Sequence, residues 1–195
     1  MIDCGVDALG ARVFLRRLTP EELDDRVIDW FRHPEAVKYY SRDPSRFGKE
    51  SLMRDLEEGW TNGTLYTYGA YVVEGEALFG ILRLGPIDLI HRTSDMPLIV
   101  GDRSIIGKGD AVEAIRLGTR LAFDKHDLRK LHGGMYEANV AAIKAYSRAG
   151  WVSEGRLIGH YFVDGESMDR ILFACFNPRY FPDLYLEPRR ELNES

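Results

Sequence analysis

The sequence predicts an α+β protein whose strands build a central sheet, and three observations support this prediction. Strand-like and helix-like segments alternate along the 195 residues. In the C-terminal half, two helical segments each lie between strands, as helical crossovers do. Apolar residues make up 45% of the chain and charged residues 29%, which is the composition of an ordinary globular domain.

Seven segments have the character of strands, and four have the apolar periodicity of amphipathic helices. The predicted strands are residues 13–18, 65–73, 77–84, 96–100, 131–136, 151–162 and 168–176. The predicted helices are residues 20–32, 49–60, 110–123 and 140–149. Thr19-Pro20 is a typical helix start, and Asp164-Gly165 is a typical hairpin turn. We expect a single domain over residues 1–195, with its core at about 11–178 and a Pro- and charge-rich tail at 179–195.

Charge and cysteine content argue against several classes of protein. The net charge of −5 does not favour a nucleic-acid partner, since such domains usually carry a basic patch. Cys4 and Cys175 are far apart and belong to no CxxC or Cys/His cluster, which argues against a metal site and a disulfide scaffold. No signal peptide and no membrane-spanning apolar stretch is recognisable, so we expect a cytoplasmic protein with no membrane partner.

A glycine-containing loop between a predicted strand and a predicted helix is the first sign of function. It reads Ser104-Ile-Ile-Gly-Lys-Gly-Asp110. Glycines let the backbone approach a ligand, and the first turn of the next helix offers unpaired N–H groups and a positive dipole end, which together suit a pyrophosphate. Val112 stands where a dinucleotide-binding loop needs its third glycine, and no Gly-Lys-Ser/Thr follows, so neither a Rossmann loop nor a P-loop is present. Taken alone, the loop could also be a tight turn whose glycines serve packing.

A second constellation follows about thirty residues later. Asn139, Ile143 and Tyr146 share one face of a predicted helix, with Asn139 at its N-cap. A phenol two turns into this helix could donate a proton to a leaving group. A half-buried core tyrosine is the alternative interpretation.

With these motifs in place, the chain resembles the GCN5-related N-acetyltransferase (GNAT) superfamily, in the branch of ribosomal-protein-alanine, polyamine and amino-sugar acetyltransferases. The family motif is Gln/Arg-x-x-Gly-x-Gly/Ala, from which this chain departs at Ser104, with Arg103 one place earlier. The resemblance implies a mixed central sheet of about seven strands flanked by about four helices. It also implies a splayed pair of strands, ending near Val100 and Tyr136, that opens a slot for CoA.

The resemblance implies acetyl-CoA as co-substrate and assigns residues to it. A strand would pair with the pantetheine arm, the glycine loop would hold the pyrophosphate, and Tyr146 would protonate the departing thiolate. The implied cofactor-binding residues are Leu98, Ile99, Val100, Ser104, Ile105, Ile106, Gly107, Lys108, Gly109, Asp110, Asn139, Lys144 and Tyr146. Arg148 is a further candidate for the adenosine phosphates.

The acceptor must be a neutral amine when it attacks the thioester, and an alkylammonium with a pKa near 10.4 has to lose a proton first. Asp95 is the expected base, with a water chain or a purely structural turn residue as the alternatives. Glu35, Tyr39 and Tyr40 are the expected substrate contacts. The loop residues His91 and Arg92 mildly favour an acceptor that carries an anionic group.

The function expected from this resemblance is direct transfer of an acetyl group from acetyl-CoA to a primary amine. The acceptor can be a protein N-terminus, an amino sugar or a small amine, and the sequence does not choose among them. The alternative is a non-catalytic acyl-CoA-binding or sensor module. Pairing through C-terminal strands is common among family members, so a homodimer is compatible with the resemblance.

Overall fold

The computed structural model of the chain describes residues 5–32, 39, 49–105 and 107–185. The described α-helices are α1 (Asp25–Trp30), α3 (Lys49–Asn62), α4 (Asp110–Arg120) and α5 (Val140–Arg148). The described strands are β1 (Val6–Leu9), β2 (Val13–Arg17), β3 (Tyr66–Val72), β4 (Leu78–Leu84), β5 (Ile87–Asp88), β6 (Thr93–Asp95), β7 (Leu98–Val100), β8 (Lys130–Tyr136), β9 (Val152–Val163) and β10 (Glu166–Phe176). No described helix is both long and apolar enough to cross a membrane.

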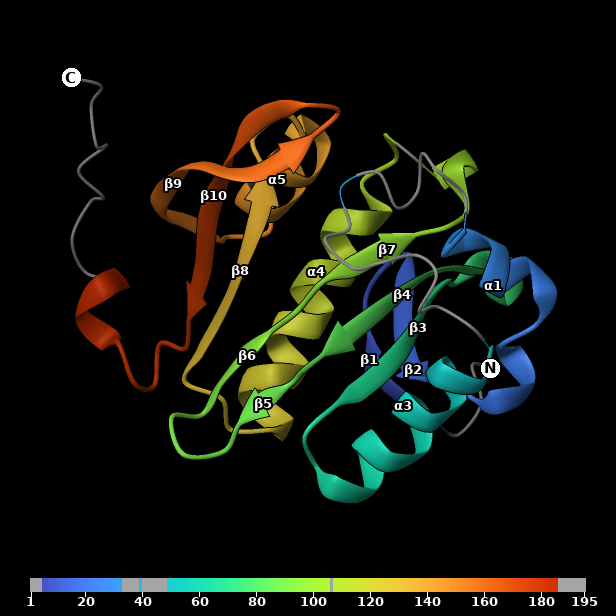
Figure 1. The fold of residues 1–195 in the computed structure, drawn as a ribbon. Coiled ribbons are helices and arrows are strands. Elements are labelled where there is room, and N and C mark those ends of the chain that lie inside the picture. Colours follow the sequence, from blue (N-terminus) through green and yellow to red (C-terminus); the bar gives the residue numbers. More distant parts are fainter. Residues whose placement is uncertain (1–4, 33–38, 40–48, 106, 186–195) are drawn as a thin grey trace.

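The described strands form two five-stranded sheets (Figure 1), with orders β1-β2-β3-β4-β7 and β5-β6-β8-β10-β9. All pairings are antiparallel except that of β6 with β8. The chain passes from the second sheet into the first at Met96-Pro97, between β6 and β7. β4 holds the two sheets together there, because Arg83 N donates to Pro97 O at 3.0 Å and Gly85 N donates to Asp95 O at 3.1 Å.

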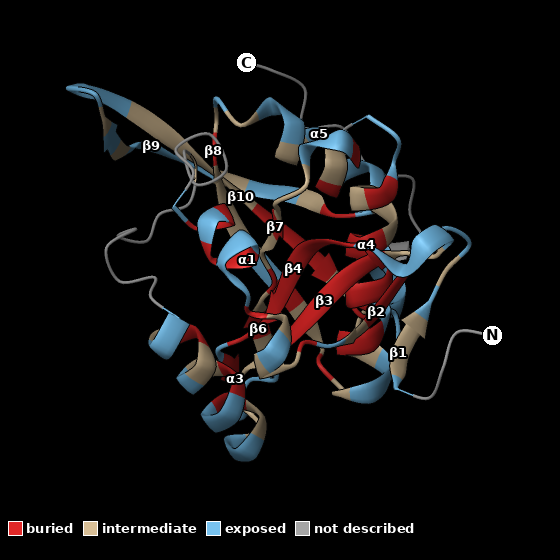
Figure 2. Ribbon diagram, turned by 90° about the vertical axis from the view of Figure 1, so that its right-hand side faces the viewer, coloured by how far each residue is buried: buried red, intermediate tan, exposed pale blue. Residues whose placement is uncertain are grey.

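The first sheet is covered on both faces, because its strands alternate buried side chains. Phe14, Tyr71 and Ile81 face one layer, together with the apolar residues of α1 and α3. Leu15, Tyr68 and Leu82 face the other layer, which α4 fills with Ile115 and Leu117. Figure 2 shows the buried residues concentrated in β2, β3, β4 and α4, whereas β9 projects with a mostly exposed surface. The first sheet and α4 therefore hold most of the buried core.

The strand that precedes the glycine loop parts from its neighbour in the second sheet. β6 pairs with β8 over Thr93 to Asp95, and then the chain turns at Pro97 so that β7 pairs with β4 instead. The residues of β8 from Gly133 onward therefore have β10 on one side and no strand partner from β6 or β7 on the other. This is the splayed pair of strands that the resemblance implies, and the fold class is confirmed.

Three local predictions differ from the structure. The helix expected over residues 20–32 is a 3₁₀ turn (Pro20–Glu22) followed by the separate helix α1, because Asp24 accepts a hydrogen bond from Val27 N at 2.9 Å and caps a new start. The stretch between the predicted strands 77–84 and 96–100, to which the sequence assigns no strand, contains β5 and β6. β1 was not predicted. These short strands lack the alternating pattern that would reveal them and form because a neighbouring edge is available.

Candidate functional site

The glycine loop leads into α4 as the sequence predicts. Gly107 and Gly109 have φ of 88° and 89°, a left-handed conformation that glycine adopts without strain. Gly109 is the N-cap of α4, so the backbone N–H groups of the first turn point out of the helix start, where no intrahelical acceptor exists. The loop thus presents backbone donors and a positive dipole end to an anion.

The side chain of Asp110 does not face this anion site. It is buried and forms an ion pair with Arg12 at 3.1 Å, while Glu113 of the next turn accepts a hydrogen bond from Ala11 N at 2.6 Å. These contacts tie the start of α4 to the turn between β1 and β2. Asp110 therefore holds the helix start in place and can serve an anion only through its backbone N–H.

A groove of about 470 Å³, here called the cofactor groove, runs from this loop across α4 to α5 and β7. Leu98, Ile99 and Val100 of β7 form one wall, and apolar side chains of α4 and α5 form the other. Its cationic residues are Arg103, Lys144 and Arg148. A long ligand with an apolar arm and a polyanionic end matches this division into apolar walls and a cationic rim.

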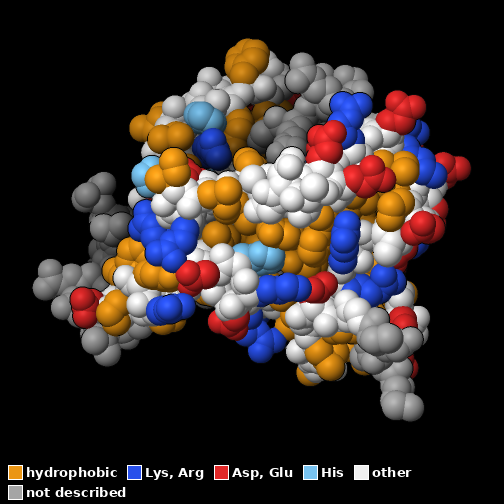
Figure 3. All heavy atoms as spheres, turned by 90° about the horizontal axis from the view of Figure 1, so that it is seen from below, with side chains coloured by type: hydrophobic (Ala, Val, Ile, Leu, Met, Phe, Trp, Pro, Cys, Tyr) orange, Lys and Arg blue, Asp and Glu red, His pale blue; other side chains and the backbone are white. Residues whose placement is uncertain are grey.

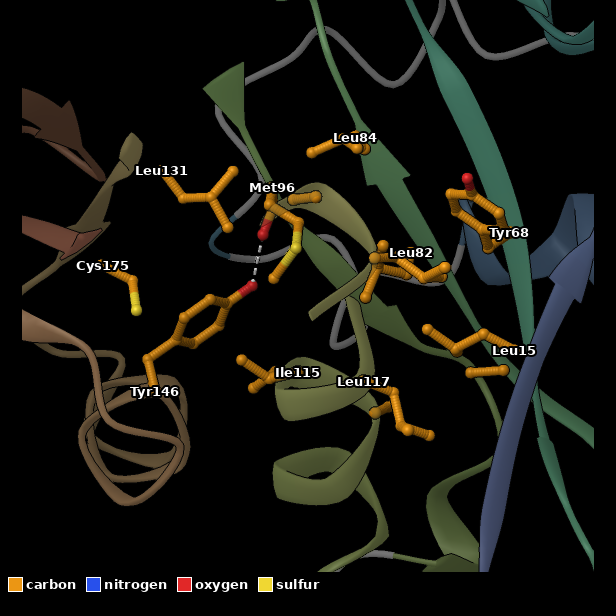
Figure 4. Close-up of a cluster of buried hydrophobic side chains, with 14 of the residues drawn as sticks. Leu15, Tyr68, Leu82, Leu84, Met96, Ile115, Leu117, Leu131, Tyr146 and Cys175 are labelled. Atoms are coloured by element: carbon orange, nitrogen blue, oxygen red, sulfur yellow. Dashed lines mark hydrogen bonds between the residues drawn. The ribbon is translucent and has the colours of Figure 1, made fainter. Parts of the chain in front are cut away.

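Tyr146 lies at the inner end of the cofactor groove, on α5. Its hydroxyl donates a hydrogen bond to Met96 O at 2.8 Å (Figure 4) and accepts one from Leu98 N at 3.1 Å. Burial of the phenol, and secondarily the charge of Asp95, raise the pKa of Tyr146 well above its usual value, although the Leu98 N–H lowers it. The phenol therefore stays protonated at neutral pH and remains a hydrogen-bond donor.

A second hollow of about 300 Å³, here called the acceptor hollow, opens beside the splayed edge of β8. Five residues line both this hollow and the cofactor groove, namely Tyr39, Leu98, Asn139, Ala142 and Tyr146. Asp95 lines only the acceptor hollow, and its Oδ1 accepts a hydrogen bond from Met96 N at 2.8 Å. The two hollows thus meet at Tyr146, with a carboxylate on the far side of the junction.

Most of the residues predicted to hold the cofactor gather at this site. Those that line the cofactor groove are Leu98, Ile99, Val100, Ile105, Gly107, Gly109, Asn139, Lys144 and Tyr146. Asn139 caps α5 as expected, since its Oδ1 accepts from Ala142 N at 3.2 Å. Ser104, Lys108 and Asp110 do not line the groove. Ile106, Glu35 and Tyr40 lie outside the described residues.

The sequence reasoning missed much of the lining of the acceptor hollow, and three of these residues bear on its chemistry. Gly133 and Gly134 of β8 line it, and so does Arg170 of β10. Two adjacent glycines inside a strand indicate that another group approaches the backbone closely there. This pattern could have indicated a site beside β8. Arg92, which was expected to favour an anionic substrate, lines neither hollow and instead contacts Asp127 at 2.6 Å.

The fold has the parts of an acyl-CoA-binding transferase: a strand, a glycine loop and a helix start that lead to a slot between splayed strands. Comparisons with known proteins identify the family. Residues 12–152 match the model of the acetyltransferase (GNAT) domain. The chain belongs to the GNAT acetyltransferase family.

Relatives of known name fall into the same family. The chain is 28% identical over 104 residues to the spermidine N(1)-acetyltransferase of Escherichia coli K12, which covers 53% of this chain and 55% of that protein. The match therefore spans only about half the length of this relative. This chain is also 24% identical over 181 residues to the probable N-acetyltransferase YjcK of Bacillus subtilis, and this match covers 87% of this chain and 96% of that protein.

Solved structures share the fold. The spermidine N-acetyltransferase of Vibrio cholerae, crystallised with CoA and spermine, superposes with a TM-score of 0.77 at 20% identity, over 88% of this chain and 99% of that one. The ribosomal-protein-S5-alanine acetyltransferase of Vibrio fischeri superposes with a TM-score of 0.72 at 16% identity, over 88% and 97% of the two chains.

Proposed function

We propose that the protein transfers an acetyl group from acetyl-CoA directly to the primary amine of a small molecule. The observation that carries this proposal is the meeting of two hollows at one tyrosine. The cofactor groove ends in a cationic rim and a glycine loop, and the acceptor hollow begins where the groove reaches Tyr146. Membership of the GNAT family and the spermidine acetyltransferase relatives support the same reaction.

Three groups at the junction account for the chemistry. The N–H of Leu98, which donates to the Tyr146 hydroxyl in this structure, would turn to the thioester carbonyl oxygen, and this hydrogen bond would strengthen as the oxygen becomes negative. Tyr146 then donates its hydrogen bond to the thiolate sulfur instead of to Met96 O. The C–N bond forms as the C–S bond breaks, and Tyr146 gives its phenolic proton to the departing sulfur. The proton that the neutral amine nitrogen loses on acylation returns to the phenolate, so no covalent intermediate on the protein is needed.

Asp95 is proposed as the group that receives the proton of the acceptor ammonium. It lines the acceptor hollow, and its charge is close enough to act on the Tyr146 phenol. A carboxylate at this position both attracts a cationic amine and accepts its proton, directly or through water. The cofactor-binding and catalytic assignments made from the sequence are retained here as proposals, with the backbone rather than the side chains of Ser104 and Asp110 in contact with the cofactor.

The size of the acceptor hollow favours a small acceptor over a protein N-terminus. About 300 Å³ is the lower end of the range for small-molecule sites. We further propose that residues 11–178 carry the whole activity and that the enzyme works in the cytoplasm, where acetyl-CoA is supplied. On the face seen in Figure 3, basic and acidic side chains are interspersed, which supports the proposal that no nucleic acid is bound.

A homodimer is also proposed, with β9 at the contact. β9 is the exposed edge of the second sheet, and its Ile158 and Phe162 are 88% and 78% exposed. Ile158→Glu should shift a dimer to monomer in sedimentation, whereas a monomeric wild-type protein would contradict the proposal.

The reaction is tested by incubating the protein with acetyl-CoA and a panel of amines, and measuring thiol release together with the mass of the amine. Equal amounts of thiol and N-acetylated amine are expected. Calorimetry of acetyl-CoA binding separates the rival function, because a sensor module would bind acetyl-CoA and release no thiol with any amine.

A further inference from the structure

Arg170 lies on β10 where this strand borders the acceptor hollow. The pairing of β10 with β9 shifts register between Met168 and Arg170, because Met168 is opposite Tyr161 and Arg170 is opposite Leu157. The extra residues belong to β9, which therefore bulges opposite Asp169. Asp169 turns to the outer side of the hairpin, where it contacts Arg156 and accepts from Gly159 N at 2.7 Å. Arg170 instead lines the acceptor hollow. Asp169 and Arg170 are consecutive residues of one strand, so the ion pair of Asp169 lies on one face and the charge of Arg170 lies on the other, toward the acceptor hollow.

Arg170 is half-buried, and its guanidinium has few partners among the described residues. Its Nε is buried without a hydrogen-bond partner, and its Nη1 is 3.4 Å from His160 Nε2, a long contact. Arg170 forms no ion pair with any carboxylate that the structure describes, whereas Arg156 on β9 pairs with both Glu137 and Asp169. A buried donor without a partner is costly, so the Nε of Arg170 points to a ligand group that completes it.

The backbone is shaped to seat this guanidinium. A Cβ at Gly134 would lie 1.8 Å from Arg170 Nε and 2.6 Å from its Nη2. Any side chain on this residue of β8 would therefore displace the guanidinium from the hollow. The other buried orphan donors among the described residues, on Trp60 and Arg83, line neither the cofactor groove nor the acceptor hollow.

We infer that the amine acceptor carries an oxyanion, a carboxylate or a phosphate, and that Arg170 binds it; this rests on the proposed acetyl transfer. A guanidinium donates several hydrogen bonds in a fixed plane that matches such a group. Asp95 is the one carboxylate among the described residues that line the hollow, so the hollow offers one anion for the amine and one cation for the oxyanion. A polyamine, which is cationic along its length, would leave Arg170 unpaired and repelled.

Matched acceptors and variants test this inference. The carboxylate arm compares 4-aminobutyrate with butylamine, and the phosphate arm compares glucosamine 6-phosphate with glucosamine; spermidine is the cationic reference. The wild-type protein should prefer the anionic member of at least one pair by kcat/KM. Arg170→Gln should raise the KM for that acceptor by about 10- to 100-fold and leave its KM for the neutral member and for acetyl-CoA unchanged. Arg170→Lys, which keeps the charge but loses the fork, should give an intermediate KM.

Arg156→Gln is the matched control, because Arg156 lies in the same hairpin and lines neither hollow. It should leave every KM unchanged. The inference would be overturned if, in both arms, the wild-type protein preferred the neutral amine or spermidine to the anionic acceptor by kcat/KM. Equal KM changes in Arg170→Gln and Arg156→Gln would also overturn it. Either result would leave acetyl transfer intact.

A binding measurement is independent of turnover. In the CoA-bound protein, titration with acetate or inorganic phosphate should give a saturable shift of the Arg170 Nε–H resonance, assigned by its loss in Arg170→Gln. A linear, non-saturating shift would overturn the inference even if no acceptor were acetylated. Absence of thiol release with every amine, by contrast, would overturn the proposed function.

Discussion

Removal of the Tyr146 hydroxyl is the perturbation whose effects the structure defines best. Tyr146→Phe deletes a donor to Met96 O at 2.8 Å and an acceptor for Leu98 N at 3.1 Å. Each hydrogen bond contributes about 0.5–1.5 kcal/mol to stability, so the loss should be about 1–3 kcal/mol. For a chain of this length, each kcal/mol lowers the Tm by about 2–4 °C. Loss of a positioned proton donor should lower kcat by at least about 100-fold.

The matched control is Tyr68→Phe. Tyr68 is also fully buried, and its hydroxyl contacts His126 Nε2 at 2.9 Å, but it lines neither hollow. Its substitution should destabilise the protein by a similar amount and leave kcat unchanged. Thiol release is measured at saturating acetyl-CoA, with thermal melting and calorimetric affinity on the same samples. A Tyr146→Phe variant that is folded, binds acetyl-CoA and retains the wild-type kcat would refute the assignment of the proton donor.

Three further predictions concern the glycine loop, the base and a buried histidine. Gly107→Ala should weaken acetyl-CoA binding by about tenfold, because its φ of 88° is strained for alanine; Gly75→Ala, at φ 78° in the β3–β4 turn, should leave the calorimetric Kd unchanged. Asp95→Asn should lower kcat/KM at pH 7 by about 100-fold, and the deficit should shrink toward pH 10 as the amine deprotonates by itself; a deficit that is constant with pH would exclude the base role. Burial lowers the pKa of His126 from 6.5 to about 4. The contribution of this residue to stability is therefore complete above pH 6.5 and is lost as the pH falls toward 4. After allowance for partial exposure, the free energy of unfolding should fall by about 1–2 kcal/mol over this range. Urea unfolding of His126→Gln should lack this slope, and a slope equal to that of the wild-type protein would contradict the burial argument.

The parts of the fold and site that the sequence predicts are those encoded by local chemistry. The glycine loop, the Asn139 cap and the hairpin turn at Asp164-Gly165 each depend on residues next to one another in the chain, and the structure has all three. The Asp164-Gly165 turn has φ of 52° and 86°, as a tight hairpin turn requires. The sequence could place Tyr146 and Asn139 at one groove because helical periodicity puts them on the same face of α5.

The parts that were missed depend on tertiary context. β1 and β5 pair only because a neighbouring edge is present, and their few residues show no period. The predicted helix over residues 20–32 is interrupted at Leu23 and Asp24, although its apolar pattern continues across the interruption. The proposed role of Arg170 depends on its place beside Gly134 of β8, a residue of another strand, which no local pattern records.

The central claim is direct acetyl transfer at the junction of the two hollows, and a single-turnover experiment tests it most directly. The protein and labelled acetyl-CoA in slight excess are rapidly mixed with an amine that the panel shows to be an acceptor. The label should pass to the amine in one step, with one thiol released per N-acetylated amine and no labelled protein at any time point. Thiol release without N-acetylated amine, or label that first accumulates on the protein, would contradict the account.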